Sequence, residues 1–173
     1  MQIHYRFAQP QDLDEVIALV RHVIRHMNEA GLHQWDLSIY PTKDDLCRDI
    51  AKGEMRVGCI NGRIAVIYVL NAEQDEAYRT AAWQYPGKAF RVLHRLCVHP
   101  DFQNMGLART TLAHMQQELL SMGIDVLRLD VFTKNPHAQR LYTNAGFHPT
   151  GSITEPIGDF IIMEKLLRKE DVQ

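Results

Sequence analysis

The dipeptide Asn61-Gly62 is the feature that most constrains the fold of this chain. It separates two apolar runs, residues 55–60 and 63–70. Asn and Gly both tolerate the positive φ of a tight hairpin turn, so the two runs are predicted to pair as antiparallel strands. Segments with helical periodicity lie before and after this hairpin, so the fold must combine strands and helices.

The remaining elements follow from the spacing of apolar residues and from Gly, Asn and Thr at the segment ends. Helices are predicted over residues 12–30, 42–52, 107–122 and 136–145. Further strands are predicted over residues 3–7, 90–98, 126–132, 147–154 and 159–166. Residues 71–88 are expected to form an irregular loop with a short helix. This order predicts one domain over residues 1–173 of the α+β (mixed α/β) class, with a central mixed sheet of about seven strands and helices on both faces.

Composition excludes several classes of function. The formal net charge of −2 is unlike the basic excess of a nucleic-acid-binding protein, so no nucleic-acid partner is expected. No apolar stretch is long enough to span a membrane, and the first residues do not resemble a signal peptide. The cysteines, Cys47, Cys59 and Cys97, are widely spaced and odd in number, so neither a disulfide framework nor a metal site is expected. We predict three buried, reduced thiols in a cytoplasmic protein.

Residues 96–108 carry the strongest chemical signal. A strand ends there, a turn follows, and a long helix begins with small residues at Gly106 and Ala108. The first turn of a helix has unpaired N–H groups and a positive dipole end, and small side chains let an anion approach them. The segment therefore indicates a phosphate site, although Gly106 alone could simply begin a helix.

The same segment resembles motif A of the GNAT acetyltransferase superfamily, because Gln103, Gly106 and Ala108 fill its Gln/Arg-x-x-Gly-x-Gly/Ala pattern. A second family motif follows at the expected distance. It consists of Asn135, Ala138, Leu141-Tyr142 and Gly146-Phe147. The order of elements also resembles that family over nearly the full chain.

The resemblance implies the GNAT acyl-CoA N-acyltransferase fold, in which strands 90–98 and 126–132 splay apart, with acetyl-CoA (coenzyme A) as co-substrate. The pantetheine arm would lie along the first of these strands like an added strand. The implied cofactor contacts are Leu96, Cys97, Val98, Gln103, Asn104, Met105, Gly106, Leu107, Ala108, Arg109, Thr110, Asn135 and Ala138. Asn104 replaces a frequent Gly, and Met105 replaces a frequent basic residue, which removes one charge near the phosphates.

Two residues are predicted to be catalytic. Tyr142 has the spacing of a core tyrosine, but the resemblance gives it the role of general acid near the CoA sulfur. His94 is the candidate base, because imidazole titrates near neutral pH. It shares a strand face with Leu96 and Val98 in a regular strand. The alternative for His94 is a purely structural histidine.

Other groups remain open as alternatives. Asp130 and Glu73 are further candidate bases. Asp130 lies in an apolar strand, so it must be functional or paired, and Arg128 or Arg95 could pair with it. Cys97 could act as a nucleophile, but nothing in the sequence indicates a covalent route.

The acceptor pocket is predicted to include Gln34 and Trp35, in the loop between the first two helices, together with Trp83 and Asp130. Each Trp could instead anchor its loop to the body of the protein. We expect an N-acetyltransferase that transfers the acetyl group directly to a primary amine of a small molecule or peptide. The alternative is a non-catalytic acyl-CoA-binding module or sensor. Phe160, Ile161 and Ile162 could support a homodimer, but a core strand has the same pattern.

Overall fold

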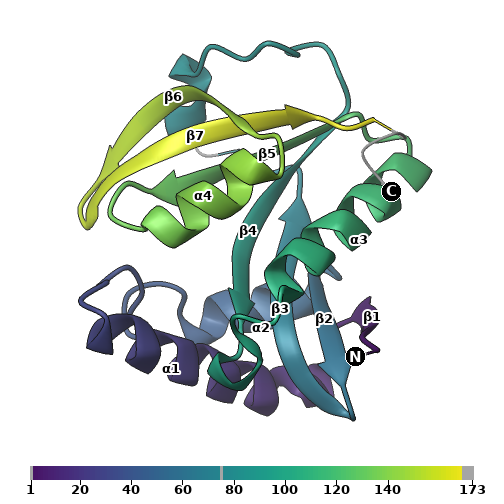
Figure 1. The fold of residues 1–173 in the computed structure, drawn as a ribbon, viewed down its shortest axis with the longest axis vertical. Helices are drawn as coiled ribbons and strands as arrows, with labels where there is room; N and C mark the ends of the chain where they lie inside the picture. Colours follow the sequence, from purple (N-terminus) through teal and green to yellow (C-terminus); the bar gives the residue numbers. More distant parts are fainter. Residues whose placement is uncertain (1, 75, 169–173) are drawn as a thin grey trace. The chain divides into compact units, whose positions relative to one another are not determined.

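The computed structural model describes residues 2–74 and 76–168, and its elements match the predicted ranges closely (Figure 1). The strands are β1 (His4–Phe7), β2 (Met55–Ile60), β3 (Arg63–Asn71), β4 (Phe90–Val98), β5 (Val126–Phe132), β6 (His148–Glu155) and β7 (Gly158–Leu166). The helices are α1 (Leu13–Glu29), α2 (Lys43–Ala51), α3 (Leu107–Ser121) and α4 (Pro136–Asn144). Short 3-10 turns are η1 (Pro10–Asp12), η2 (Glu76–Thr80) and η3 (Pro100–Phe102). The predicted irregular loop with a short helix is confirmed over residues 72–74 and 76–88, where η2 is the short helix, whereas Asn71 belongs to β3 and residue 75 lies outside the described residues.

The strands form one mixed seven-stranded sheet in the order β1-β2-β3-β4-β5-β7-β6. The hairpin prediction is confirmed: Ile60 pairs with Arg63, and Asn61 and Gly62 have φ of 50° and 80°. Strands β4 and β5 are parallel, and their register joins residues 90–92 to residues 126–128. Both strands continue beyond these pairs, so within the described residues the pairing is confined to their first parts, as predicted for strands that splay.

Contacts divide the chain into two compact units. The first unit contains Met1–Leu70 and Arg95–Ala108, and the second contains Asn71–His94 and Arg109–Gln173. The expectation of one domain over residues 1–173 stays a prediction. The candidate residues are therefore described below within the unit to which each belongs.

In the first unit, α1 and α2 cover one face of β2 and β3. The apolar stripe of α1, which repeats every three or four residues, buries Val16, Leu19, Val20 and Val23 against the strands. Glu15 also accepts a 2.7 Å hydrogen bond from the backbone N–H of Ile64, which ties α1 to β3. A second cluster on the sheet contains the first residues of α3, including Leu107. Helices thus pack on both faces, because β2 and β3 have buried side chains on both sides.

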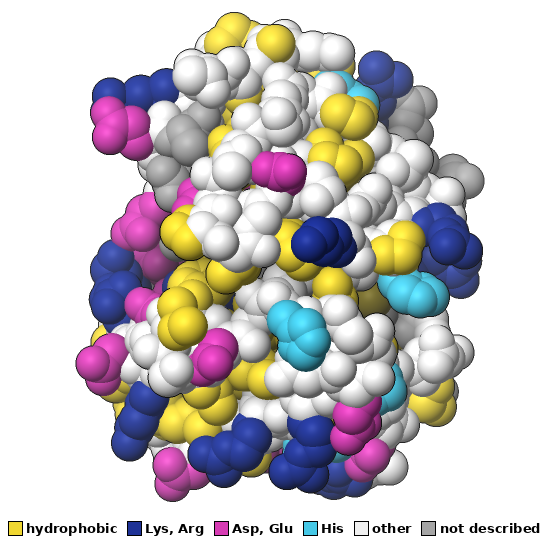
Figure 2. Space-filling model, turned by 90° about the vertical axis from the view of Figure 1, so that its left-hand side faces the viewer, with side chains coloured by type: hydrophobic (Ala, Val, Ile, Leu, Met, Phe, Trp, Pro, Cys, Tyr) yellow, Lys and Arg dark blue, Asp and Glu magenta, His cyan; other side chains and the backbone are white. Residues whose placement is uncertain are grey.

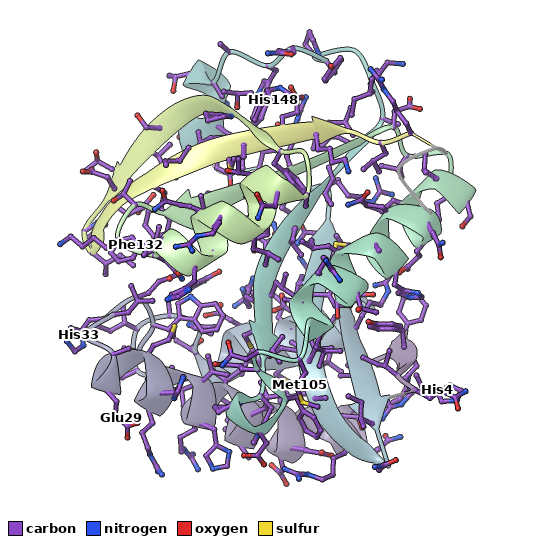
Figure 3. The ribbon with its side chains drawn as sticks, in the orientation of Figure 1. His4, Glu29, His33, Met105, Phe132 and His148 are labelled. Atoms are coloured by element: carbon purple, nitrogen blue, oxygen red, sulfur yellow. The ribbon has the colours of Figure 1, made fainter. Side chains whose placement is uncertain are left out.

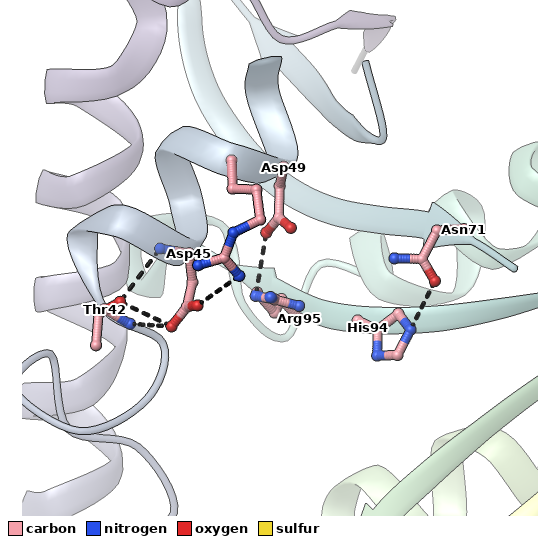
Figure 4. Close-up of polar contacts among 7 residues, drawn as sticks. Thr42, Asp45, Asp49, Asn71, His94 and Arg95 are labelled. Carbon is pink, nitrogen blue, oxygen red and sulfur yellow. Dashed lines mark hydrogen bonds and ion pairs between the residues drawn. The ribbon is translucent and has the colours of Figure 1, made fainter. Parts of the chain in front are cut away.

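Helix α2 begins where the sequence predicts. Thr42 Oγ1 accepts a 3.2 Å hydrogen bond from the backbone N–H of Asp45, and Asp45 Oδ2 accepts one of 2.8 Å from the N–H of Thr42 (Figure 4). This reciprocal capping box satisfies two N–H groups that the helix itself leaves unpaired.

In the second unit, α4 packs against β5, and β7 lies between β5 and β6. Lys165 of β7 and Gln116 of α3 are both buried, and Lys165 Nζ donates a 2.9 Å hydrogen bond to Gln116 Oε1. Phe160 and Ile162 of β7 are buried within the chain, which supports the core-strand interpretation of this segment.

The structure also tests the predictions about the thiols, the surface charges and membrane-spanning segments. All three cysteines are free, but Cys47 is exposed and Cys59 is half-buried, so the prediction of three buried thiols is wrong except for Cys97. Cys47 lies on the short helix α2 beside, and not within, the buried stripe of Leu46, Asp49 and Ile50. On the face drawn in Figure 2, basic side chains lie beside acidic ones, in keeping with the balanced composition. Among the described residues, no helix is both long and apolar enough to cross a bilayer.

Candidate active site

The segment between β4 and α3 belongs to the first unit and is held by its own polar contacts. Gln103 Nε2 donates a 3.0 Å hydrogen bond to the carbonyl oxygen of Val98, which folds the loop back onto the end of β4. The backbone N–H of His99 donates a 2.8 Å hydrogen bond to the carbonyl of Ala65 in β3. Gln103 therefore shapes the loop through its side chain, independently of any ligand.

Two residues of this loop have left-handed backbone conformations. Asn104 has φ of 59° and Gly106 has φ of 77°. Asn tolerates this region better than other non-glycine residues, so Asn104 preserves the turn in place of Gly, as the sequence analysis predicts. A Cβ built on Gly106 would meet no heavy atom within 4 Å, so the backbone before α3 is open to a ligand. This open turn, which leads into a 15-residue helix, fits a bound phosphate or pyrophosphate.

Met105 lies at the surface of the same turn, and its side chain is 56% exposed (Figure 3). It carries no charge that could attract an anion to this turn. Leu107 is buried and Ala108 half-buried in the adjacent apolar cluster, where they anchor the beginning of α3.

The three predicted contacts at the end of β4 lie on different sides of the strand. Leu96 and Val98 pack in the cluster with Phe102, whereas Cys97 packs in the core beneath α1 and α2. Burial raises the pKa of the Cys97 thiol far above its ordinary value. Because only a thiolate is an effective nucleophile, Cys97 is unsuited to a covalent route.

Arg109 and Thr110 belong to the second unit and lie on the first turn of α3. They line a cavity of about 900 Å³. Gln116, Gly146 and Lys165 are also among its lining residues. Arg109 thus borders an open space large enough for a small molecule.

Helix α4 places the second predicted motif in the second unit. Asn135 Oδ1 accepts a 3.1 Å hydrogen bond from the backbone N–H of Ala138, so Asn135 caps α4. Tyr142 is 8% exposed, and its ring packs edge-on against Phe147 with centroids 5.7 Å apart. The Asn-x-x-Ala spacing is therefore explained by the helix cap, and Tyr142 is largely buried as its periodicity predicts.

His94 is half-buried on β4 in the second unit, and its Nε2 lies 3.0 Å from Oδ1 of Asn71, at the end of β3 (Figure 4). The same oxygen accepts a 3.0 Å hydrogen bond from the backbone N–H of Glu73. Asn71 is 7% exposed and thus firmly packed. Glu73, the alternative base, is exposed on the following loop.

Arg95 interrupts the alternation of β4 because its φ is 53°. The regular strand face predicted for His94, Leu96 and Val98 is therefore broken after His94. In the first unit, the Arg95 guanidinium forms a 3.1 Å ion pair with Asp49 of α2, and both side chains are buried (Figure 4). Burial raises the pKa of Asp49 to about 6, while Arg95 opposes that shift. The ion pair holds a conformation that costs a non-glycine residue about 1–2 kcal/mol.

Asp130 on β5 has a partner for which the sequence carries no signal. It accepts a very short hydrogen bond from the hydroxyl of Tyr78, a buried residue of η2. Arg128 instead pairs with Glu164 at 3.2 Å, and both of these side chains are buried. Arg128 and Arg95 each form an ion pair with another carboxylate, so the pairing of either arginine with Asp130 stays a prediction.

The two tryptophans behave as anchors within their own units. Trp35 packs at the margin of the core formed by α1 and α2, and the neighbouring Gln34 is half-buried. The guanidinium of Arg128 lies over the ring of Trp83, and its central carbon is 4.0 Å from the centroid of that ring. The Trp83 ring also packs edge-on against Tyr78. A common acceptor pocket formed by the two tryptophans stays a prediction.

Two polar residues near the candidate bases were missed from the sequence. Asn71 looks like the first residue of a polar loop, and Tyr78 lies in a segment without periodicity. The pattern Asn71-x-Glu73 could have indicated a side-chain-capped turn at a strand end. No sequence signal connects Tyr78 to Asp130, because these residues come together only through tertiary packing.

The mixed seven-stranded sheet and the turn before α3 agree with the acyl-CoA-dependent acyltransferase class that the sequence motifs indicate, and comparison with known families supports it. Residues 57–147 match the family described as the acetyltransferase (GNAT) family. Because this match covers more than half of the 173 residues, the chain belongs to the GNAT acetyltransferase family.

Known relatives are consistent with this assignment. The "[Ribosomal protein bS18]-alanine N-acetyltransferase" of Escherichia coli K12 is 32% identical over 88 residues, which are 51% of this chain and 50% of that protein. The chain thus spans about half the length of the curated relatives it matches.

Solved structures share the fold. A GNAT-family acetyltransferase from Streptococcus agalactiae 2603 superposes with a TM-score of 0.84 at 23% identity, over 96% of both chains. The PaiA N-acetyltransferase from Thermoplasma acidophilum, solved in complex with coenzyme A, superposes with a TM-score of 0.71 at 20% identity. That match covers 96% of this chain and 99% of the other.

Proposed function

We propose that this protein is an acetyl-CoA-dependent N-acetyltransferase that transfers an acetyl group directly to a primary amine. The observation that carries the proposal is the open turn before α3, in which Asn104 and Gly106 adopt left-handed conformations at the beginning of a long helix. Family membership supports acetyl transfer as the reaction. Backbone N–H groups of residues 104–108 would hold the pyrophosphate of coenzyme A, since the N–H of Gln103 already donates to the carbonyl of Pro100, and Arg109 and Thr110 would follow on α3.

Within this proposal the bound co-substrate supplies an acetyl thioester. His94 accepts the proton of the incoming ammonium group, and Tyr142 donates a proton to the departing thiolate. Tyr142 is held in place for this role by the edge-on packing of its ring against Phe147. Asp130, held by Tyr78, remains the alternative base and a candidate contact for the acceptor amine.

The acceptor is proposed to be the amine of a small molecule or of a peptide. The name of the relatives that match half of this chain favours a peptide that begins with alanine as the first acceptor to test. The cytoplasmic location and a possible homodimer remain predictions from the sequence.

The first experiment is thermal unfolding with coenzyme A, acetyl-CoA and longer acyl-CoAs. A donor present at a hundred times its Kd adds about 2.7 kcal/mol to the free energy of unfolding, which raises the Tm by roughly 5–10 °C. The best donor is then tested with spermidine, lysine and an alanine-initiated peptide, and release of free thiol is followed. Stabilisation with turnover supports the proposal, whereas stabilisation without turnover favours a binding module. The absence of stabilisation by every donor contradicts the assignment of the loop.

A further inference from the structure

We propose that Asn71 is a positioning residue that holds His94 in the tautomer with the proton on Nε2, so that Nδ1 is the proton acceptor. This inference rests on the proposed function, in which His94 is the base. It assigns a role to a residue outside both family motifs. The inference depends on one oxygen atom, Oδ1 of Asn71 at the end of β3, which faces two hydrogen-bond donors.

The identity of that atom follows from its first partner. The backbone N–H of Glu73 donates to the side-chain atom of Asn71 at 3.0 Å, and a backbone N–H can only donate. The atom facing it is therefore the carbonyl oxygen Oδ1 and not the amide nitrogen. Asn71 is 7% exposed, so this orientation is fixed by packing.

The tautomer of His94 follows from the same atom. Its Nε2 lies 3.0 Å from Oδ1 of Asn71, and a carbonyl oxygen can only accept. Nε2 must therefore carry the hydrogen, which leaves the lone pair of the neutral imidazole on Nδ1. The two donors occupy both lone pairs of Oδ1, so the amide oxygen is saturated and the ring orientation is defined.

This arrangement suits one step of the proposed reaction. Nδ1 of His94 takes a proton from the ammonium form of the acceptor, and the freed amine lone pair attacks the acetyl carbonyl. The C–S bond then breaks, and the thiolate takes a proton from Tyr142. Nε2–H continues to donate to Asn71 while the ring is an imidazolium, so the ring does not turn during the step. The new amide loses its second N–H proton to water, and the imidazolium and the Tyr142 phenolate return to their neutral forms by exchange with water.

Two substitutions of Asn71 distinguish its role in the turn at Glu73 from its role in positioning His94. Asn71→Asp keeps an oxygen for both donors. Asn71→Ser keeps an oxygen for the N–H of Glu73, because serine forms similar turns, but its side chain is too short to reach His94. The two variants are therefore matched in the turn and differ in the contact to the imidazole.

The first readout is long-range ¹H–¹⁵N NMR of the free protein. We expect His94 to be the Nε2–H tautomer in the wild type, with a proton that exchanges slowly with water. The slow exchange should persist in Asn71→Asp and be lost in Asn71→Ser. Observation of a proton on Nδ1 of neutral His94 overturns the inference, and so does unchanged exchange in Asn71→Ser.

The second readout is kinetic. We expect Asn71→Ser to lower kcat at least tenfold, with the KM for acetyl-CoA unchanged and kcat largely restored in Asn71→Asp. In a His94→Gln background the same substitution should have no further effect, because its action passes through His94. An equal loss in both backgrounds contradicts the positioning role. If no amine is acetylated, the proposed function fails, while the NMR result still decides the tautomer that Asn71 imposes.

Discussion

Substitution of Gly106 tests the proposed anion loop most directly. Gly106 and Gly123 lie before and after α3, have φ of 77° and 74°, and at both positions an added Cβ would meet no heavy atom within 4 Å. Alanine at either position therefore introduces the same backbone strain without a clash. That strain is about 1 kcal/mol, which should lower the Tm of each variant by roughly 2–4 °C.

Glutamate at these positions adds a charge to the same strain. A carboxylate about 5 Å from one phosphate charge repels it by about 1 kcal/mol in water and by about 3 kcal/mol at an effective dielectric constant of 20. Gly106→Glu should therefore weaken acetyl-CoA binding by roughly 5- to 150-fold. Gly123→Glu lies at the other end of the helix and should leave the affinity unchanged.

The assay is isothermal titration calorimetry of the wild type and the four variants with acetyl-CoA, together with their thermal unfolding. We expect matched losses of Tm within the alanine pair and a loss of affinity in Gly106→Glu only. Gly123→Glu should lower the Tm more than Gly106→Glu, because a negative charge is unfavourable at the C-terminal end of a helix. Equal affinities in Gly106→Glu and the wild type would refute the loop assignment. Equal weakening by Gly123→Glu would show that the effect is not local to the loop.

Three further results are expected. Tyr142→Phe should lower kcat at least tenfold with little change in the Kd for acetyl-CoA, and equal turnover would remove Tyr142 from the acid role. Iodoacetamide should modify exposed Cys47 but not Cys97, which is buried and has a raised pKa. Mass spectrometry of the labelled protein measures this, and early labelling of Cys97 would contradict it. Burial raises the pKa of Asp49 from its ordinary value of 3.8 to about 6, so between these two pH values the folded protein binds more protons than the unfolded chain. The free energy of unfolding should therefore fall, relative to that of Asp49→Asn, as pH rises towards 6. The expected fall, measured in urea titrations, is up to about 1.4 kcal/mol per pH unit. A rise would contradict the raised pKa.

The secondary structure was predictable because its signals are local. The turn at Asn61-Gly62, the capping box at Thr42 and the left-handed Asn104 each depend on residues close in the sequence. Motif A was predictable for the same reason, because a strand end, a turn and a helix start are contiguous. These features position the proposed phosphate site.

The partners of the charged and polar side chains were not predictable in this way. Asp130 accepts a hydrogen bond from Tyr78, which lies 52 residues away and has no pattern that connects it to Asp130. The break in β4 at Arg95 is accompanied by an ion pair with Asp49 of another element. Such contacts leave no periodic pattern in the sequence.

The order of elements, the mixed class of the sheet and the family motif follow from the sequence alone, because each arises from propensities and spacings within a short segment. The tertiary structure was needed to show which side chain contacts His94 and which atom of Asn71 faces the imidazole. The physical reason is that a hydrogen bond of 3.0 Å depends on the positions of β3 and β4 to a fraction of an ångström. Those positions are fixed by packing over the whole sheet and not by any one segment.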